Sequence, residues 1–333
     1  MNILTDSDKA TAVSVVVIGR NEGDRLRRCL ASLATQTRRI VYVDSASSDD
    51  SVKLARSMGV QVVSLDMALP FTAARARNAG YANMRALYPH TEHVQFVDGD
   101  CEVAAGWLAS ASRFLALHRD VAVVCGRRRE RYPDLSIYNR LCDSEWDTPV
   151  GETKACGGDA LMRVSAFAAS GGFRSELIAG EEPELCLRLR AAGWKIWRLQ
   201  QEMTLHDAAM TRFVQWWRRS RRGGYAFAEG AQLHGAAPER HWVRESRRSL
   251  LWGAGIPLLS FSLSAWLGAW GMVLLLLYPA QVMRLALRGT RPLRERWWHA
   301  LFLVLGKFPE ALGHLNFIYD RLAGKTARLI EYK

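Results

Sequence analysis

One stretch decides the fold: His93-Val94-Gln95-Phe96-Val97-Asp98-Gly99-Asp100-Cys101-Glu102. Its first half is largely apolar and rich in β-branched and aromatic residues, which predicts a buried strand. The strand then stops in two carboxylates separated by a glycine. Carboxylates at that spacing, at the exposed end of a strand, can hold a divalent cation and leave room for substrate phosphates. Because Asp-Gly is also an ordinary turn pair, the stretch by itself leaves both interpretations open.

Further strand patterns lie on both sides of this stretch and alternate with helix patterns. The strands are expected at Val13–Ile18, Ile40–Val43, Val60–Leu65 and Val121–Cys125. Strand and helix alternation of this length predicts βαβ units and a doubly wound α/β sheet. In such sheets, ligands bind beyond the carboxyl ends of the strands.

Polar clusters follow three of these strands directly, at Arg20-Asn21-Glu22, Asp44 and Asp98-Gly99-Asp100. Because the carboxyl ends of parallel strands meet at one edge of the sheet, we expect these clusters to converge on one site. No G-x-G-x-x-G follows the first strand, and no P-loop motif occurs in the sequence. A dinucleotide site and a P-loop are therefore disfavoured, and a nucleotide would be held by acidic residues and a metal.

The composition indicates a globular chain with an anionic partner. The net charge of +12 points to nucleic acid, a phosphorylated substrate or an acidic membrane surface. The six cysteines form no C-x-x-C pair, which favours free thiols in a reducing compartment over disulfides or a zinc site. The polar segment Met1 to Ala12 predicts no signal peptide, so the chain is expected to begin in the cytoplasm.

Several motifs, in this order and spacing, resemble glycosyltransferase family two, which has the GT-A fold. The resemblance runs from about Val13 to Tyr225 and implies a GT-A-like doubly wound mixed sheet. It further implies an inverting transferase of hexosyltransferase type that takes its sugar from a nucleotide-diphosphate sugar. The matching pieces are Arg20-Asn21-Glu22, Val43 to Asp49, Ala76 to Gly80, Asp98-Gly99-Asp100, Cys156 to Arg163, Gly171-Gly172-Phe173 and Gly180 to Arg190.

The resemblance implies roles for individual residues. Asp44 would contact the nucleotide base, Asp98 would lie near the ribose and sugar, and Asp100 would bind a metal bridging the diphosphate. The expected metal is Mn²⁺ or Mg²⁺, a Lewis acid that neutralises the leaving diphosphate, and its expected ligands are Asp100, Asp98 and His206. A lone histidine beside an apolar segment is also often structural. The donor-binding set is expected to be Asn21, Glu22, Asp44, Arg77 and Asp98.

The catalytic base of the family is usually an Asp in a Glu-Asp pair before an amphipathic helix. Here the pair reads Glu181-Glu182, so Glu182 aligns with the base and Glu181 is its neighbour in the candidate pair. A glutamate keeps the carboxylate but adds one methylene, so the acceptor hydroxyl would sit slightly further away. Alternatively, these carboxylates simply favour a helix N-terminus, with Pro183 in its first turn.

The C-terminal third predicts membrane association. From Leu250 to Leu287 the only charged residue is Arg284, and arginines lie on both sides of the apolar region. Basic flanks at both ends favour a hairpin or re-entrant loop with both ends cytoplasmic, with its turn near Gly268-Ala269-Trp270-Gly271. A buried soluble helical pair is the alternative. The segment Gln215 to Arg219 resembles the Q-x-x-R-W signature of polymerising members but lacks its tryptophan, which makes processive synthesis doubtful.

Together these patterns predict four regions: a polar tail at 1–12, a glycosyltransferase domain at 13–240, a membrane-associated hairpin and interfacial helix at 241–310, and a cytoplasmic tail at 311–333. The enzyme is expected on the cytoplasmic face of the inner membrane, acting on a lipid-linked or glycan acceptor, with no nucleic-acid partner. The alternatives are an inactive GT-A scaffold protein of a polysaccharide complex, motivated by the glutamate at position 182, and a sugar-nucleotidyltransferase. The latter would want a Gly-rich, lysine-bearing loop after the first strand, and this loop is absent.

Overall fold

The computed structural model describes residues 13–289, 291–325 and 330. The expected polar tail at 1–12 and the end of the expected C-terminal tail lie outside these residues. The chain forms two compact units. The first comprises residues 1–177 and 181–211, and the second comprises residues 178–180 and 212–333. The first unit therefore ends earlier than the expected boundary at residue 240, because the helix after Thr211 packs with the C-terminal helices.

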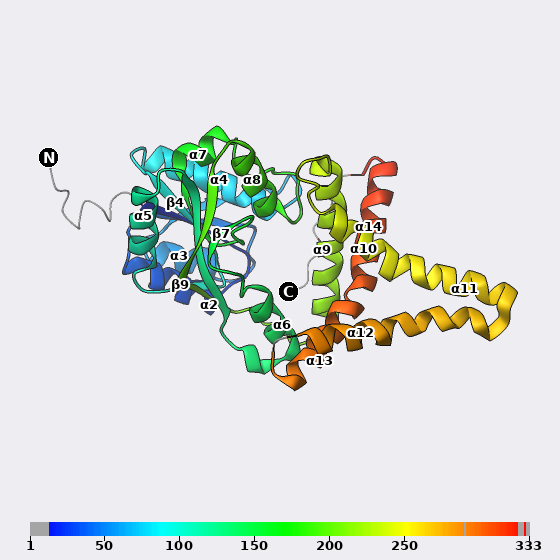
Figure 1. Ribbon diagram of the computed structural model, residues 1–333. Helices are drawn as coiled ribbons and strands as arrows, with labels where there is room; N and C mark the ends of the chain where they lie inside the picture. Colours follow the sequence, from blue (N-terminus) through cyan, green and yellow to red (C-terminus); the bar gives the residue numbers. More distant parts are fainter. Residues whose placement is uncertain (1–12, 290, 326–329, 331–333) are drawn as a thin grey trace. The chain divides into compact units, whose positions relative to one another are not determined.

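A nine-stranded mixed sheet forms the centre of the first unit (Figure 1). Its parallel half contains β1 (Val13–Gly19), β2 (Ile40–Asp44), β3 (Gln61–Ser64) and β4 (His93–Asp98). Its other half contains β8 (Ala160–Arg163), β6 (Val121–Glu130), β9 (Lys195–His206) and β5 (Cys101–Val103), and the short β7 (Gly151–Thr153) pairs with β9. The order is β3-β2-β1-β4-β8-β6-β9-β5, and β8 runs antiparallel to β4 and β6. The predicted mixed α/β sheet is confirmed.

Helices connect the strands and supply apolar faces to the core. They are α2 (Asp24–Ala34), α3 (Ser51–Ser57), α4 (Ala73–Leu87), α5 (Trp107–Leu117), α6 (Ile137–Glu145), α7 (Val164–Ala169) and α8 (Glu181–Ala191), with a 3₁₀ turn at Pro133–Leu135. Leu26, Leu30 and Leu33 of α2 are fully buried, as a stripe of that period requires. Helix α4 lies so close to β1 and β2 that a Cβ on Gly80 would come within 2.3 Å of Val16.

Strand β6 is longer than its apolar pattern predicts. The expected strand ends at Cys125, whereas the observed strand continues through three arginines to Glu130. The polar extension is held by pairing with β9, with register shifts on both sides of Arg127, and such bulges re-aim side chains near functional sites. Neither the extension nor β9 is visible in the apolar periodicity, because their residues are ordered by a neighbouring strand.

The second unit is helical. It contains α9 (Phe213–His234), α10 (Val243–Leu250), a π-helical turn (Leu251–Gly255), α11 (Ile256–Leu267), a 3₁₀ segment (Gly268–Leu276), α12 (Leu277–Arg288), α13 (Leu293–Leu305) and α14 (Lys307–Leu322). Helices α9 and α14 pack with their backbones close together. The glycines Gly224 and Gly313 permit this approach, because a Cβ on either would collide with the backbone of the other helix. The region expected as a tail from residue 311 is thus, up to Leu322, part of a packed helix.

An apolar hairpin projects from this helical unit (Figure 1). Helix α11 ends at Gly268, whose φ of +57° breaks the helix, and the chain then returns beside α11. The two arms are joined by a hydrogen bond from Ser260 Oγ to the carbonyl of Gly271, 2.8 Å long, and by contact of Tyr278 with Trp252. The turn lies where the sequence predicts it.

The surface of this hairpin is largely apolar and exposed. Trp266 is 89% exposed and Trp270 is 79% exposed, although both side chains are apolar. Among the described residues, one helical stretch, Val243–Arg288, is long and apolar enough to cross a membrane. Only 11% of its most apolar window is buried, which argues against the buried soluble helical pair.

Candidate functional site

The polar clusters expected after the strands do meet at one edge of the sheet. In the parallel pairing of β1 with its two neighbours, Gly19 lies opposite Asp44 and Ile18 lies opposite Asp98. The two carboxylates therefore flank the end of β1, opposite successive residues of that strand. Asp100 follows one turn after Asp98, immediately before β5.

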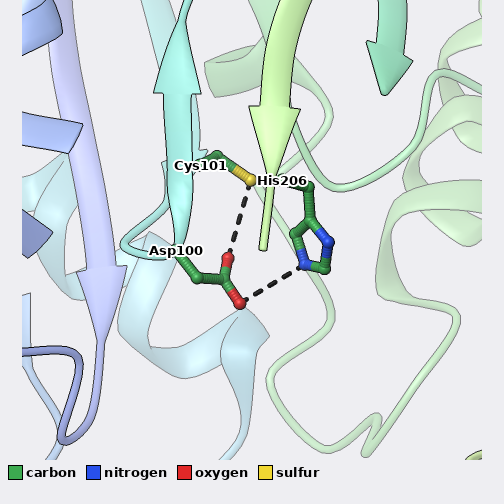
Figure 2. A group of neighbouring side chains, drawn as sticks. All are labelled: Asp100, Cys101 and His206. Atoms are coloured by element: carbon green, nitrogen blue, oxygen red, sulfur yellow. Dashed lines mark hydrogen bonds and ion pairs between the residues drawn. The ribbon is translucent and has the colours of Figure 1, made fainter. Parts of the chain in front are cut away.

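Asp100 faces a histidine from a distant part of the chain (Figure 2). Strand β5 pairs with the end of β9, and this pairing places Cys101 opposite His206. Asp100 Oδ2 lies 3.3 Å from His206 Nε2, and the Cys101 thiol donates to Asp100 Oδ1 at 3.6 Å. All three side chains are buried.

A second carboxylate fixes the imidazole ring from the other side. Glu130 Oε2 lies 3.3 Å from His206 Nδ1. With the proton on that nitrogen, Nε2 presents its lone pair toward Asp100 and toward any cation bound there. Burial, aided by the nearby Arg128 guanidinium, lowers the pKa of His206, which keeps the ring neutral at physiological pH. A neutral imidazole oriented by a carboxylate is the usual form of a metal-ligating histidine. Asp100 and His206 therefore fit a divalent cation.

Cys101 does not fit as an anionic ligand. Burial raises the pKa of its thiol well above the ordinary value, so the sulfur keeps its proton and acts as a hydrogen-bond donor. The oxygen and nitrogen donors of Asp100 and His206 suit Mn²⁺ or Mg²⁺ better than a thiolate would.

Asp98 lies in an ion-pair network. Its Oδ1 accepts from Arg77 Nη2 at 2.7 Å, and its Oδ2 accepts from Arg128 Nη2 at 3.4 Å. Arg77 also donates to Glu181 Oε1 at 2.5 Å. Arg128 also forms an ion pair with the fully buried Asp159, in which Nη1 lies 3.3 Å from Oδ2. Asp98 is thus held by two guanidinium groups, whereas Asp100 faces the histidine.

The remaining donor-site candidates form the loop beside β1 and β2. Asp44 is 4% exposed and accepts hydrogen bonds from the Tyr42 hydroxyl at 3.1 Å and from the Ser47 amide at 3.0 Å. Asn21 has a φ of +56°, a conformation that asparagine tolerates better than most residues, and its side chain accepts from the Ser48 amide at 2.7 Å. The Glu22 amide donates to Ser51 Oγ, which ties this cluster to α3.

The two glutamates that are candidates for the catalytic base lie in different surroundings. Glu181 lies on the Arg77 and Asp98 side. Glu182 is buried, and its Oε1 accepts from the Cys156 amide at 2.5 Å and from the Cys186 thiol at 3.1 Å. Burial raises the pKa of Glu182 above the ordinary value. The segment Cys156-Gly157-Gly158-Asp159 connects the two parts of the site. Its first residue donates its amide to Glu182, and its last residue pairs with Arg128.

The comparison with known families matches this arrangement. The model of the family described as Glycosyl transferase family 2 matches residues 14–169, a range that includes Asp44, Asp98 and Asp100. This part of the chain, just under half of its length, matches glycosyltransferase family 2. The resemblance expected from the motifs is confirmed, as is the enzyme class.

Individual relatives of this glycosyltransferase are distant. The succinoglycan biosynthesis protein ExoA of Rhizobium meliloti (strain 1021) is 26% identical over 206 residues, which cover 57% of this chain and 62% of that protein. The match thus spans less than two thirds of this curated relative. Among solved structures, the mannosyltransferase PcManGT from Pyrobaculum calidifontis, described in complex with GDP-Man and Mn²⁺, is similar with a TM-score of 0.59 and 21% identity. That match covers 91% of this chain and 87% of the other.

A second solved structure supports the same GT-A fold. Residues 1–349 of TarS from S. aureus align with a TM-score of 0.52 and 14% identity, over 94% of this chain and 92% of that one. At these identities the likeness establishes the fold of the glycosyltransferase and nothing about its substrates.

Sequence reasoning missed three residues of the site: Arg128, Glu130 and Asp159. Asp159 lies within a motif that the family resemblance covers, so the sequence indicated that the segment matters but did not indicate what Asp159 binds. Arg128 and Glu130 lie on the polar extension of β6, where the only signal is a charged run that resembles a solvated surface strand. Their partners, Asp98 and His206, are distant in sequence.

Proposed function

We propose that this glycosyltransferase moves a sugar from a nucleotide-diphosphate sugar to a lipid-linked or polysaccharide acceptor, with a divalent metal and inversion at the anomeric carbon. The arrangement of Asp100 just after β4, His206 at the end of β9 and Glu130 at the end of β6 carries the proposal. It offers oxygen and nitrogen ligands beside the sheet edge where β2 ends in Asp44 and β4 ends in Asp98. The complex of the similarly folded mannosyltransferase with GDP-Man and Mn²⁺ supports this choice of donor and metal.

Asp100 and His206 would hold the cation, and Glu130 would orient the imidazole. When bound, Mn²⁺ or Mg²⁺ supplies Lewis-acid neutralisation of the diphosphate leaving group. Asp44 would contact the base of the nucleotide. Asp98, fixed by Arg77 and Arg128, would accept hydrogen bonds from the ribose and the sugar. Asn21 and Glu22 would form the wall of the donor pocket beside β1.

Glu182 would act as the general base. Its buried position raises its pKa toward the working pH, as efficient proton transfer requires. The Cys156 amide and the Cys186 thiol fix the carboxylate. Glu181 is ion-paired with Arg77, which suits it to positioning. Removal of the acceptor proton by Glu182 and direct attack by the acceptor oxygen would invert the anomeric carbon.

The hairpin supports a membrane location and a lipid-linked acceptor. Exposed tryptophans on a long apolar stretch suit the interface and core of a bilayer. Flanking arginines would cost several kcal/mol each at the bilayer centre, so both ends are expected on the cytoplasmic face. The name of the curated relative, a succinoglycan biosynthesis protein, supports polysaccharide assembly as the setting.

Calorimetry with a nucleoside diphosphate and Mn²⁺ tests the metal site. Asp100→Ala should abolish metal-dependent binding of the nucleotide, while Glu202→Gln, a change at an exposed ion pair, should leave it unchanged. Nucleotide binding by Asp100→Ala at the wild-type affinity would show that the cation sits elsewhere.

Transfer assays test the base. Glu182→Gln should keep nucleotide binding and lower turnover by about 10²–10⁴-fold, the usual contribution of general-base catalysis. A loss confined to Glu181→Gln would move the base by one residue. Failure of the wild-type protein to hydrolyse or transfer any nucleotide sugar in a Mn²⁺ panel would favour the inactive scaffold protein.

A further inference from the structure

A cavity lies at the foot of the hairpin, where α12 turns into α13. Its volume is about 230 Å³. Basic side chains line one part of it, and apolar side chains line another. The basic group consists of Arg288, Arg291, Arg296 and His299, and the apolar group includes Leu285 and Leu303. Among the described residues that line the cavity, none is acidic.

Arg296 is built into the wall of this cavity. Its Nη1 donates to the carbonyl of Gly289 at 3.2 Å, which connects α13 to the end of α12. Gly289 makes this approach possible, because a Cβ at that position would lie 2.9 Å from Cγ of Arg296. The side chain is therefore held in one orientation by the turn that it closes.

The same side chain has an unsatisfied donor. Arg296 Nε is buried and has no hydrogen-bond partner among the described residues. A buried donor without a partner destabilises the structure, and three guanidinium groups around one cavity repel one another. An anion with several acceptor oxygens would remove both costs, and guanidinium groups bind phosphate through paired, charge-assisted hydrogen bonds.

The position of the cavity indicates what carries the anion. Helix α12 is the returning arm of the apolar hairpin, and Leu285 and Leu303 add apolar contacts beside the arginines. A ligand that fits both parts has a phosphate group and an apolar chain. We propose that this cavity binds the phosphate group of an anionic lipid. The proposal concerns a site in the helical unit and does not depend on the assignments of the catalytic residues.

Native mass spectrometry of the full-length protein in a neutral detergent tests the proposal. The probes are phosphatidylglycerol, a polyisoprenyl phosphate and, as the zwitterionic comparison, phosphatidylcholine. Each lost guanidinium–phosphate contact should weaken binding of an anionic lipid by about tenfold or more. Arg296→Ala should show this loss. Arg294→Ala is the matched control, because it removes the same charge from the same helix at a residue outside the cavity.

Two further variants separate the site from simple attraction of charge. Arg296→Lys keeps the charge but lacks the Nε donor and the planar fork, so it should also bind anionic lipid more weakly. Arg288→Ala, at an exposed position on α12, should weaken binding even if Arg296→Ala does not fold. The anionic lipid that the wild-type protein retains identifies the source of the phosphate.

Specific outcomes would overturn the proposal. Equal losses in Arg296→Ala and Arg294→Ala would mean that the arginines act only as a diffuse basic surface. Equal binding of phosphatidylcholine and both anionic lipids would mean that the cavity does not select anionic lipids. Unchanged binding in Arg288→Ala and Arg296→Lys would mean that the guanidinium groups of the cavity do not bind the phosphate. Loss of sugar transfer with retained lipid binding would instead contradict the proposed function alone.

Discussion

Replacing Glu130 by glutamine should disrupt the proposed metal site without changing either of the proposed metal ligands, Asp100 and His206. Each oxygen of Glu130 accepts from two buried or partly buried donors. Oε2 accepts from His206 Nδ1 and the Ala208 amide, and Oε1 accepts from the Tyr132 amide and Asn139 Nδ2. A glutamine has one oxygen, so its amino group must face one of these pairs of donors.

Neither orientation of the new amide fits. If the amino group faces Tyr132 and Asn139, two donors lose their acceptor, which costs about 2–6 kcal/mol at about 1–3 kcal/mol per unsatisfied donor. Asn139 cannot simply turn over, because its Oδ1 accepts from the Met210 amide at 3.1 Å. If the amino group faces His206, the ring must accept at Nδ1. The proton then moves to Nε2, and that nitrogen can no longer bind a cation.

We therefore expect Glu130→Gln to lower Mn²⁺ affinity by about 10–100-fold, the usual effect of removing a group that orients a metal ligand. Titration of Mn²⁺ followed by electron paramagnetic resonance of the free ion measures this affinity. Urea unfolding measures the accompanying loss of stability. Glu202→Gln is the control, because its ion pair with Arg129 is half exposed and such pairs contribute about 0–1 kcal/mol. Wild-type Mn²⁺ affinity in a folded Glu130→Gln protein would refute the reasoning.

Three further predictions concern stability and membrane attachment. Burial lowers the pKa of His93 from 6.5 to about 4. As the pH falls, the unfolded chain therefore protonates this histidine before the folded chain does. The free energy of unfolding should fall by about 3 kcal/mol between pH 6.5 and pH 4. His93→Gln should flatten that slope in unfolding curves, and an unchanged slope would assign it to another group. Gly80→Ala should destabilise by about 1–3 kcal/mol, because its Cβ would lie 2.3 Å from Val16. Gly223→Ala, with no atom near its Cβ, should lower neither the stability nor the melting temperature. The full chain should stay in membranes through a high-salt wash, which screens surface charges but not insertion, and release by salt would exclude an inserted hairpin.

Local sequence patterns determined the parallel strands, the placement of two site carboxylates and the turn of the hairpin. Continuous apolar runs such as Val13–Ile18 predicted the parallel strands, because strands covered on both faces need no alternation. Since parallel strands end at one edge, the placement of Asp44 and Asp98 followed from the chain alone. The hairpin turn near Gly268 was also readable, because the apolar region is longer than one span needs and carries arginines at both ends.

The tertiary structure decided which polar groups meet. Glu130 reaches His206 only because the bulged extension of β6 pairs with β9, and a strand stabilised by its neighbour carries no apolar period of its own. The opposite surroundings of Glu181 and Glu182 likewise come from distant partners, Arg77 for the first and Cys156 for the second. The arginines near residue 290 were readable as a basic flank, whereas their arrangement around a cavity depends on how α12 meets α13. Sequence fixes which groups are available at short range, and long-range packing fixes the distances on which ion pairs and ligand sites depend.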